Sequence, residues 1–209
     1  MNLVAVIGIA VCWGALALTW LAGAIYYEPK APAERKRSLF GAAFWPGLIA
    51  TIAITYAVPR ADWNSLALHP VWVRILGLAI LVASTALALW ARLVLGAMWT
   101  AAPAVKQEHK LRTSGPYDVT RHPIYTGMLG MLLGGGLLAG GVRWIVPFPV
   151  FLVFVEIKLR IEERFMLAEF PDDYPLYRQR VPQLIPGLRL IRRVHAHQAP
   201  RQPERSAKQ

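Results

Sequence analysis

Five apolar runs, separated by short polar segments, dominate the chain. They cover residues 3–27, 39–58, 71–99, 124–140 and 145–157. An α-helix needs about 20 apolar residues to cross the hydrocarbon core of a bilayer, and the first three runs reach that length. The first run lacks a basic leading segment and is longer than the ~7–15-residue core of a signal peptide, so we expect it to be a membrane helix. The pattern predicts five transmembrane helices.

The fourth run is short and rich in glycine. Glycine lets two helix backbones approach closely, so we expect this helix to pack tightly against a neighbour. Only a tight return at Arg143 and Trp144 separates the fourth run from the fifth, which predicts a helical hairpin. The glycines concerned are Gly127, Gly130, Gly134, Gly135 and Gly136.

From Lys158 onward, charged and apolar residues alternate at helical spacing. We therefore expect the fifth helix to leave the membrane as an amphipathic helix that ends at Pro171. An aromatic and basic segment follows at residues 174–186, and residues 192–209 have no periodicity and are predicted to be disordered. Residues 1–191 are predicted to form one all-α polytopic membrane domain.

The composition agrees with a membrane protein. Hydrophobic residues make up 56% of the chain, against ~45–50% in ordinary soluble domains. The formal net charge is +11, which we assign to basic loops beside anionic headgroups rather than to nucleic-acid binding. Cys12 is the single cysteine, so an intrachain disulfide is excluded.

The distribution of lysine and arginine predicts the orientation. With the N-terminus outside, the predicted inner segments hold nineteen of these residues and the outer segments three. Basic loops favour the cytoplasmic side. The sequence therefore predicts an integral membrane protein, in a bacterial inner membrane, with the N-terminus outside and the C-terminus in the cytoplasm.

One polar stretch, residues 114–127, lies between the third and fourth apolar runs. It begins with the turn-forming Ser-Gly-Pro and continues to Pro123, a residue that suits the first turn of a helix. It is therefore predicted to be a loop running into a helix N-terminus, where free N–H groups can hold a carboxylate or phosphate. It also supplies a guanidinium, an imidazole and two phenols, from Arg121, His122, Tyr117 and Tyr125.

A second polar group lies at the end of the fifth run. Lys158 and Glu162 are four residues apart, and Arg160 and Glu163 are three apart, so each pair shares a helix face. On spacing alone these are surface ion pairs, worth ~0–1 kcal/mol each. The alternative is that Glu162 points into a site and binds a cation or a hydroxyl.

Two further features have open interpretations. Arg92 lies near the end of the third run, where it either extends to the membrane surface or serves a polar site there. His109 and His122 have no obvious third ligand, so no metal site is predicted. The sequence also lacks a phosphate-binding glycine loop and a nucleophile elbow.

Four pieces of sequence carry a resemblance to a known family. They are LRTSGPY at 111–117, RHPIYTG at 121–127, the pair Glu162-Glu163, and DYPLYRQRVP at 173–182. In this order and spacing they resemble the isoprenylcysteine carboxyl methyltransferase family, which is related to the phospholipid methyltransferases. The resemblance covers roughly residues 97–186.

The resemblance implies a membrane enzyme that transfers a methyl group from S-adenosylmethionine to a lipid-soluble acceptor, at a cytoplasmic cofactor site. Glu162 would bind the amino group or ribose of the cofactor, and two tyrosine rings could contact the sulfonium. Lys106, or the adjacent Gln107, corresponds to a family glutamine only loosely, because the loop length differs. The cofactor residues implied are Lys106, His109, Leu111, Tyr117, His122, Pro123, Ile124, Tyr125 and Glu162.

The acceptor is less well defined. The family places an arginine one turn before the glutamate to hold a substrate carboxylate, and this chain has Lys158 there, with Arg160 and Arg121 as other candidates. Lysine lacks the bidentate fork of arginine. An isoprenylcysteine-type or other lipid carboxylate, a phospholipid amine and a small thiol all stay open. The acceptor is expected to enter from the bilayer through a gap at the glycine-rich fourth helix.

Two other functional classes compete with the methyltransferase. A membrane scaffold without turnover would not need the intact polar residues of the site. A transporter is disfavoured because the five predicted spans show no inverted repeat. The predicted partners are the bilayer and a lipophilic acceptor, without nucleic acid.

Overall fold

The computed structural model describes residues 3–27, 53, 57, 70–96, 111–140 and 147–185. These residues form helices and connecting turns and contain no strand, as the all-α prediction requires. Most of the second predicted span, residues 39–58, lies outside the described residues, as do 97–110 and the C-terminal tail. The helices are α1 (Leu3–Tyr27), α4 (Val71–Leu95), α5 (Pro116–Val119), α6 (Pro123–Ala139), α7 (Pro147–Glu169) and α8 (Asp173–Arg180).

Two of the described helices are long and apolar enough to cross a membrane. They are α1, over Leu3–Gly23, and α4, over Val71–Leu95. The apolar helix α6 is shorter, and α7 continues without a break from its apolar start into its charged end. The number of spans and the amphipathic character of the C-terminal part stay predictions.

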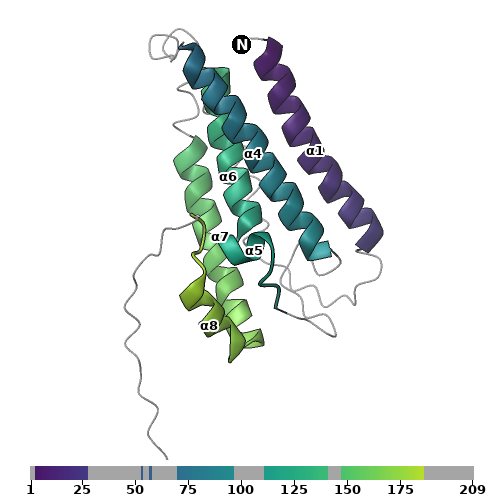
Figure 1. Ribbon diagram of the computed structural model, residues 1–209, viewed down its shortest axis with the longest axis vertical. Helices are drawn as coiled ribbons and strands as arrows, with labels where there is room; N and C mark the ends of the chain where they lie inside the picture. The colour runs from purple at the N-terminus through teal and green to yellow at the C-terminus, as the bar shows by residue number, and fades with distance from the viewer. Residues whose placement is uncertain are drawn as a thin grey trace, which may run out of the picture.

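The long helices lie side by side (Figure 1), with α6 between α4 and α7. One apolar cluster joins α1, α4 and α6, and includes Leu16, Leu81 and Met131. A second joins α6 to α7, where Val155 and Leu159 are buried. Helices α6 and α7 therefore pack against each other, while the return predicted at Arg143 and Trp144 lies outside the described residues.

The glycines of α6 explain how closely it approaches α4. A Cβ atom at Gly127 would lie 2.7 Å from the Ala88 Cβ, and one at Gly134 would lie 2.5 Å from the backbone nitrogen of Leu81. The predicted close packing is confirmed. At Gly127 and Gly134 the space beside α6 is filled by α4, and a lateral gap elsewhere along this helix stays a prediction.

Arg92 is buried at the end of α4, with 3% of its surface exposed. Its Nη1 donates a hydrogen bond to the Gly96 carbonyl at 3.0 Å, and its guanidinium lies 6.0 Å from the centroid of the Trp20 ring. The guanidinium also fills the space where a Cβ at Gly23 would be. Arg92 therefore packs against α1 rather than extending to the membrane surface.

Replacing Gly134 with alanine is expected to reduce the free energy of unfolding by about 1 to 3 kcal/mol, because the added methyl group would overlap the α4 backbone. Titration of detergent-purified protein with SDS measures this change. Gly135→Ala is the matched control on the same helix, since its Cβ would lie 3.6 Å from Ile9 Cγ1, an ordinary contact. Equal destabilisation by the two substitutions would contradict the packing described here.

Candidate functional site

The polar stretch folds as the sequence predicts, as a loop that runs into a helix N-terminus. Gly115 adopts φ +65°, a conformation that glycine tolerates without strain, and α5 begins directly after it. Thr120 is extended, His122 precedes α6, and Pro123 occupies the first turn of that helix. This geometry turns the chain so that His122 faces the charged end of α7.

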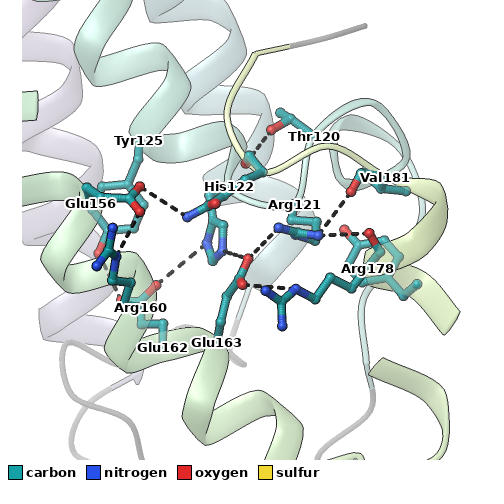
Figure 2. Close-up of polar contacts among 12 residues, drawn as sticks. Thr120, Arg121, His122, Tyr125, Glu156, Arg160, Glu162, Glu163, Arg178 and Val181 are labelled. Atoms are coloured by element: carbon teal, nitrogen blue, oxygen red, sulfur yellow. Dashed lines mark hydrogen bonds and ion pairs between the residues drawn. The ribbon is translucent and has the colours of Figure 1, made fainter. Parts of the chain in front are cut away.

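His122 lies between two carboxylates (Figure 2). Its Nδ1 is 3.7 Å from Glu162 Oε2, and its Nε2 is 3.5 Å from Glu163 Oε1. The His122 side chain is 9% exposed, so its ring orientation is set by these neighbours and by surrounding packing. The adjacent residues Glu162 and Glu163 therefore meet the same imidazole from different sides.

Glu163 is the buried member of this carboxylate pair, with 8% of its side chain exposed. Its Oε1 forms an ion pair with Arg121 Nη2 at 2.7 Å, and its Oε2 lies 3.4 Å from Arg178 Nε. Burial by itself raises the pKa of Glu163, but the contact with His122 and the charges of Arg121 and Arg178 outweigh it. The net result is a pKa below the usual 4.5.

Glu162 is the more open member, with 26% of its side chain exposed. Its Oε1 accepts a hydrogen bond from the Tyr125 hydroxyl at 2.9 Å and lies 3.2 Å from Lys158 Nζ. The contact of its Oε2 with His122, at 3.7 Å, is longer than a hydrogen bond. Within the described residues, Oε2 thus keeps the capacity to accept hydrogen bonds from a ligand.

Residues 181–185, here called the C-terminal strap, run alongside the polar stretch. The backbone N–H groups of Arg121 and His122 donate to strap carbonyls at 2.9 and 3.2 Å. The hydroxyls of Thr120 and Thr126 donate to two strap carbonyls at 2.8 and 2.7 Å. The accepting carbonyls belong to Pro182, Gln183 and Leu184. The strap thereby fixes the backbone that carries His122.

Arg121 is engaged by the protein on several sides. Besides its ion pair with Glu163, its Nη1 donates to the carbonyl of Arg178 at 2.9 Å and to that of Val181 at 3.3 Å (Figure 2). Both acceptors lie in the segment formed by α8 and the start of the strap. Through these contacts the guanidinium holds that segment against the polar stretch.

The structure brings together most of the residues singled out from the sequence. Lys158 and Glu162 pair as their spacing predicts, and Tyr125 joins them. Tyr117 and Ile124 pack together in a separate apolar cluster that includes Ala91 of α4. These contacts do not test ligand binding, so the binding roles of these residues stay predictions.

Four other candidates either lie apart from this cluster or fall outside the described residues. Leu111 packs beside the tyrosines of α8. Lys106 and His109 lie outside the described residues. Arg160 pairs with Glu156 at 2.9 Å and its side chain is 70% exposed, so the interpretation that Arg160 and Glu163 form a pair is wrong.

Sequence reasoning missed the buried contacts that shape the site. They involve Thr120, Thr126, Glu163, Tyr177 and Arg178. The available signals were the second glutamate of the carboxylate pair and the YRQRVP segment. Neither reveals which distant residue it would contact.

Comparisons with known proteins agree with the motifs. A family model described as phospholipid methyltransferase matches residues 72–173, a range that contains the carboxylate pair and the polar stretch. Protein-S-isoprenylcysteine O-methyltransferase of Schizosaccharomyces pombe is 35% identical over 81 residues, 38% of this chain and 34% of that protein. Methanethiol S-methyltransferase 2 of Bradyrhizobium diazoefficiens is 35% identical over 94 residues, 43% of this chain and 34% of that protein. The matched regions thus span about a third of each of these relatives.

A solved structure shares the fold. It is that of the eukaryotic intramembrane Ras methyltransferase ICMT (isoprenylcysteine carboxyl methyltransferase), with a TM-score of 0.56. The match covers 86% of this chain and 68% of that chain, at 20% sequence identity. The two chains therefore share the arrangement of their helices.

Replacing Glu163 with glutamine is expected to reduce the free energy of unfolding near pH 7 by about 3 to 5 kcal/mol, because the charge of Arg121 would stay buried without a partner. The folded pKa of Glu163 is lowered, so its contribution is present above about pH 4.5 and lost as the pH falls through the folded value. The difference between wild type and variant should therefore shrink below about pH 4.5. SDS titration at several pH values measures it.

Glu156→Gln is the control for this substitution. Glu156 is also a carboxylate of α7, but its side chain is 38% exposed and pairs with the exposed Arg160. It is expected to change stability by less than about 1 kcal/mol. A Glu163 variant that is as stable as this control at pH 7 would contradict the role assigned to the buried ion pair.

Proposed function

Because the chain belongs to the membrane methyltransferases related to phospholipid methyltransferase and isoprenylcysteine carboxyl methyltransferase, we propose that it transfers a methyl group from S-adenosylmethionine to a lipophilic acceptor. The observation that carries this proposal is the state of Glu162. It is a partly exposed carboxylate of α7 that lies beside Tyr125 in the first turn of α6, and one of its oxygens is left able to accept hydrogen bonds. It thus offers an acceptor to the ammonium group or the ribose hydroxyls of the cofactor.

The neighbouring groups fit the rest of the cofactor. The first-turn N–H groups at Ile124 and Tyr125 suit the carboxylate of its amino-acid part. The rings of Tyr117 and Tyr125 suit a cation. His109 and Lys106, by resemblance, would complete this set together with Leu111, Pro123 and His122. Bound S-adenosylmethionine would supply an electrophilic methyl group on a positively charged sulfur.

The work left to the protein is to hold the reactants and exclude water. Direct displacement at a methyl group requires little acid–base chemistry. The charged groups of the described site are accordingly paired with one another. Tyr125 and Lys158 hold the Glu162 carboxylate in place, and Glu163 holds His122 and Arg121. These groups therefore act by fixing positions rather than by moving protons.

For the acceptor, Lys158 is the best-placed cation. Its side chain is 19% exposed, and it lies one turn before Glu162, toward the apolar part of α7. A point charge there suits the carboxylate of an isoprenylcysteine-type or other lipid acid. Arg160 is directed to an exposed pair with Glu156, and Arg121 is better assigned to positioning than to substrate binding.

Two alternatives for the acceptor keep specific support. A small thiol, ionised as a thiolate, would also suit Lys158, and one similar protein is named a methanethiol S-methyltransferase. A phospholipid amine is suggested by the description of the matching family model. A scaffold without turnover is the alternative of another class, and cofactor affinity distinguishes it.

The location proposed for the reaction is the cytoplasmic face of a bacterial inner membrane, with the N-terminus outside. The excess of basic residues in the predicted inner segments supports this orientation. It would give the site access to a soluble cofactor in the cytoplasm and to an acceptor in the bilayer.

Detergent-purified protein is expected to bind S-adenosylmethionine in a calorimetric titration, and Glu162→Gln should weaken binding about 10- to 100-fold, because it removes a charged hydrogen-bond acceptor. Glu169→Gln is the control. Glu169 lies near the end of the same helix and makes no ion pair with another described residue. It is expected to leave the affinity unchanged.

Two results would count against the proposal. Absence of binding by folded wild-type protein, with and without added membrane lipid, would favour the scaffold. Binding that is equally strong in the wild type and the Glu162 variant would remove the cofactor from the site described here.

A further inference from the structure

The hydroxyl of Tyr177, on α8, reaches across to the polar stretch. It donates a hydrogen bond of 2.6 Å to the backbone carbonyl of Tyr117, a residue 60 positions earlier in the chain. Tyr177 is 4% exposed and Tyr117 is 8% exposed, so the bond is shielded from water. Burial raises the pKa of Tyr177 above the usual 10.0.

The bond acts on α5, which is a single helical turn of four residues. The other phenol in this arrangement, that of Tyr117, donates to the Ala91 carbonyl of α4 at 3.4 Å. Tyr117 is therefore held through its side chain by α4 and through its backbone by α8. Loss of the Tyr177 bond would leave the Tyr117 carbonyl buried without that partner, an unfavourable state.

The effect extends along the chain to the carboxylate site. After α5, the backbone N–H groups of Arg121 and His122 bond to the C-terminal strap, which continues directly from α8. Helix α8 thus bonds to the polar stretch at Tyr117, through the Tyr177 hydroxyl, and the strap bonds to it farther along, at Arg121 and His122. His122, which contacts both carboxylates, is itself one of the residues that the strap holds.

We propose that Tyr177 is a positioning residue for the cofactor site, which it keeps in a binding-competent arrangement through the carbonyl of Tyr117. This inference rests on the proposed function for the identity of the ligand. It does not place Tyr177 in contact with cofactor or acceptor. If only a fraction of molecules holds the competent arrangement, the apparent dissociation constant rises in inverse proportion to that fraction.

Tyr174 provides a matched control. It lies on the same helix, one turn earlier, and is 2% exposed in the same apolar cluster as Tyr177. Its hydroxyl is buried but has no hydrogen-bond partner in the described part of the chain. Tyr177→Phe and Tyr174→Phe therefore each remove one buried hydroxyl from α8, but only the first removes a bond to the polar stretch.

The test compares these two variants with the wild type by calorimetric titration with S-adenosylmethionine and by hydrogen exchange. Tyr177→Phe is expected to raise the dissociation constant about tenfold, which corresponds to the loss of one buried hydrogen bond. It should also speed exchange of the Arg121 and His122 amides, with the amides in the middle of α6 unchanged. Tyr174→Phe should leave the affinity and these exchange rates within about twofold of the wild type.

Unchanged affinity and exchange in Tyr177→Phe would overturn the inference, as would equal changes in the two variants. A lower unfolding temperature with unchanged affinity would assign Tyr177 a purely structural role and would also overturn it. If the wild type binds no S-adenosylmethionine, the proposed function fails. The exchange rates at Arg121 and His122 then decide by themselves whether Tyr177 positions the polar stretch.

Discussion

The buried ion pair between Glu163 and Arg121 is the contact on which the rest of the site depends. At 2.7 Å, with both side chains 8% exposed, it joins the end of α7 to the residue that precedes His122. Two charges in such surroundings are stable only if each keeps its partner. The same guanidinium donates to one carbonyl in α8, that of Arg178, and to one at the start of the strap, that of Val181. One side chain thus connects the polar stretch, α7 and the C-terminal strap.

Two adjacent glutamates have different environments because successive residues of a helix point about 100° apart. Glu163 turns toward the protein interior and is held by arginines, while Glu162 turns toward Tyr125 and Lys158 and keeps an open oxygen. The imidazole of His122 contacts both. We infer that this division assigns one carboxylate to support and the other to ligand binding, which explains why a site of this kind would need both.

The sequence was sufficient for features that depend on neighbours along the chain. Pro123 indicated the start of α6, the spacing of Lys158 and Glu162 indicated their pairing, and the glycines of α6 indicated close helix packing. It was not sufficient for contacts between residues 40 to 60 positions apart, such as Arg121 with Glu163, because helical periodicity does not specify which distant side chains meet. The glycines illustrate this limit, since the sequence indicated close packing but not that α4 would be the partner.

Methyl transfer at the site around Glu162 can be measured by incubating purified protein with methyl-labelled S-adenosylmethionine and bacterial membrane extract, then following label into lipid-soluble and volatile products. We expect labelled product with the wild type and almost none with a folded Glu162→Gln variant. Equal labelling by the two proteins, or none in any fraction with folded wild-type protein, would contradict this expectation.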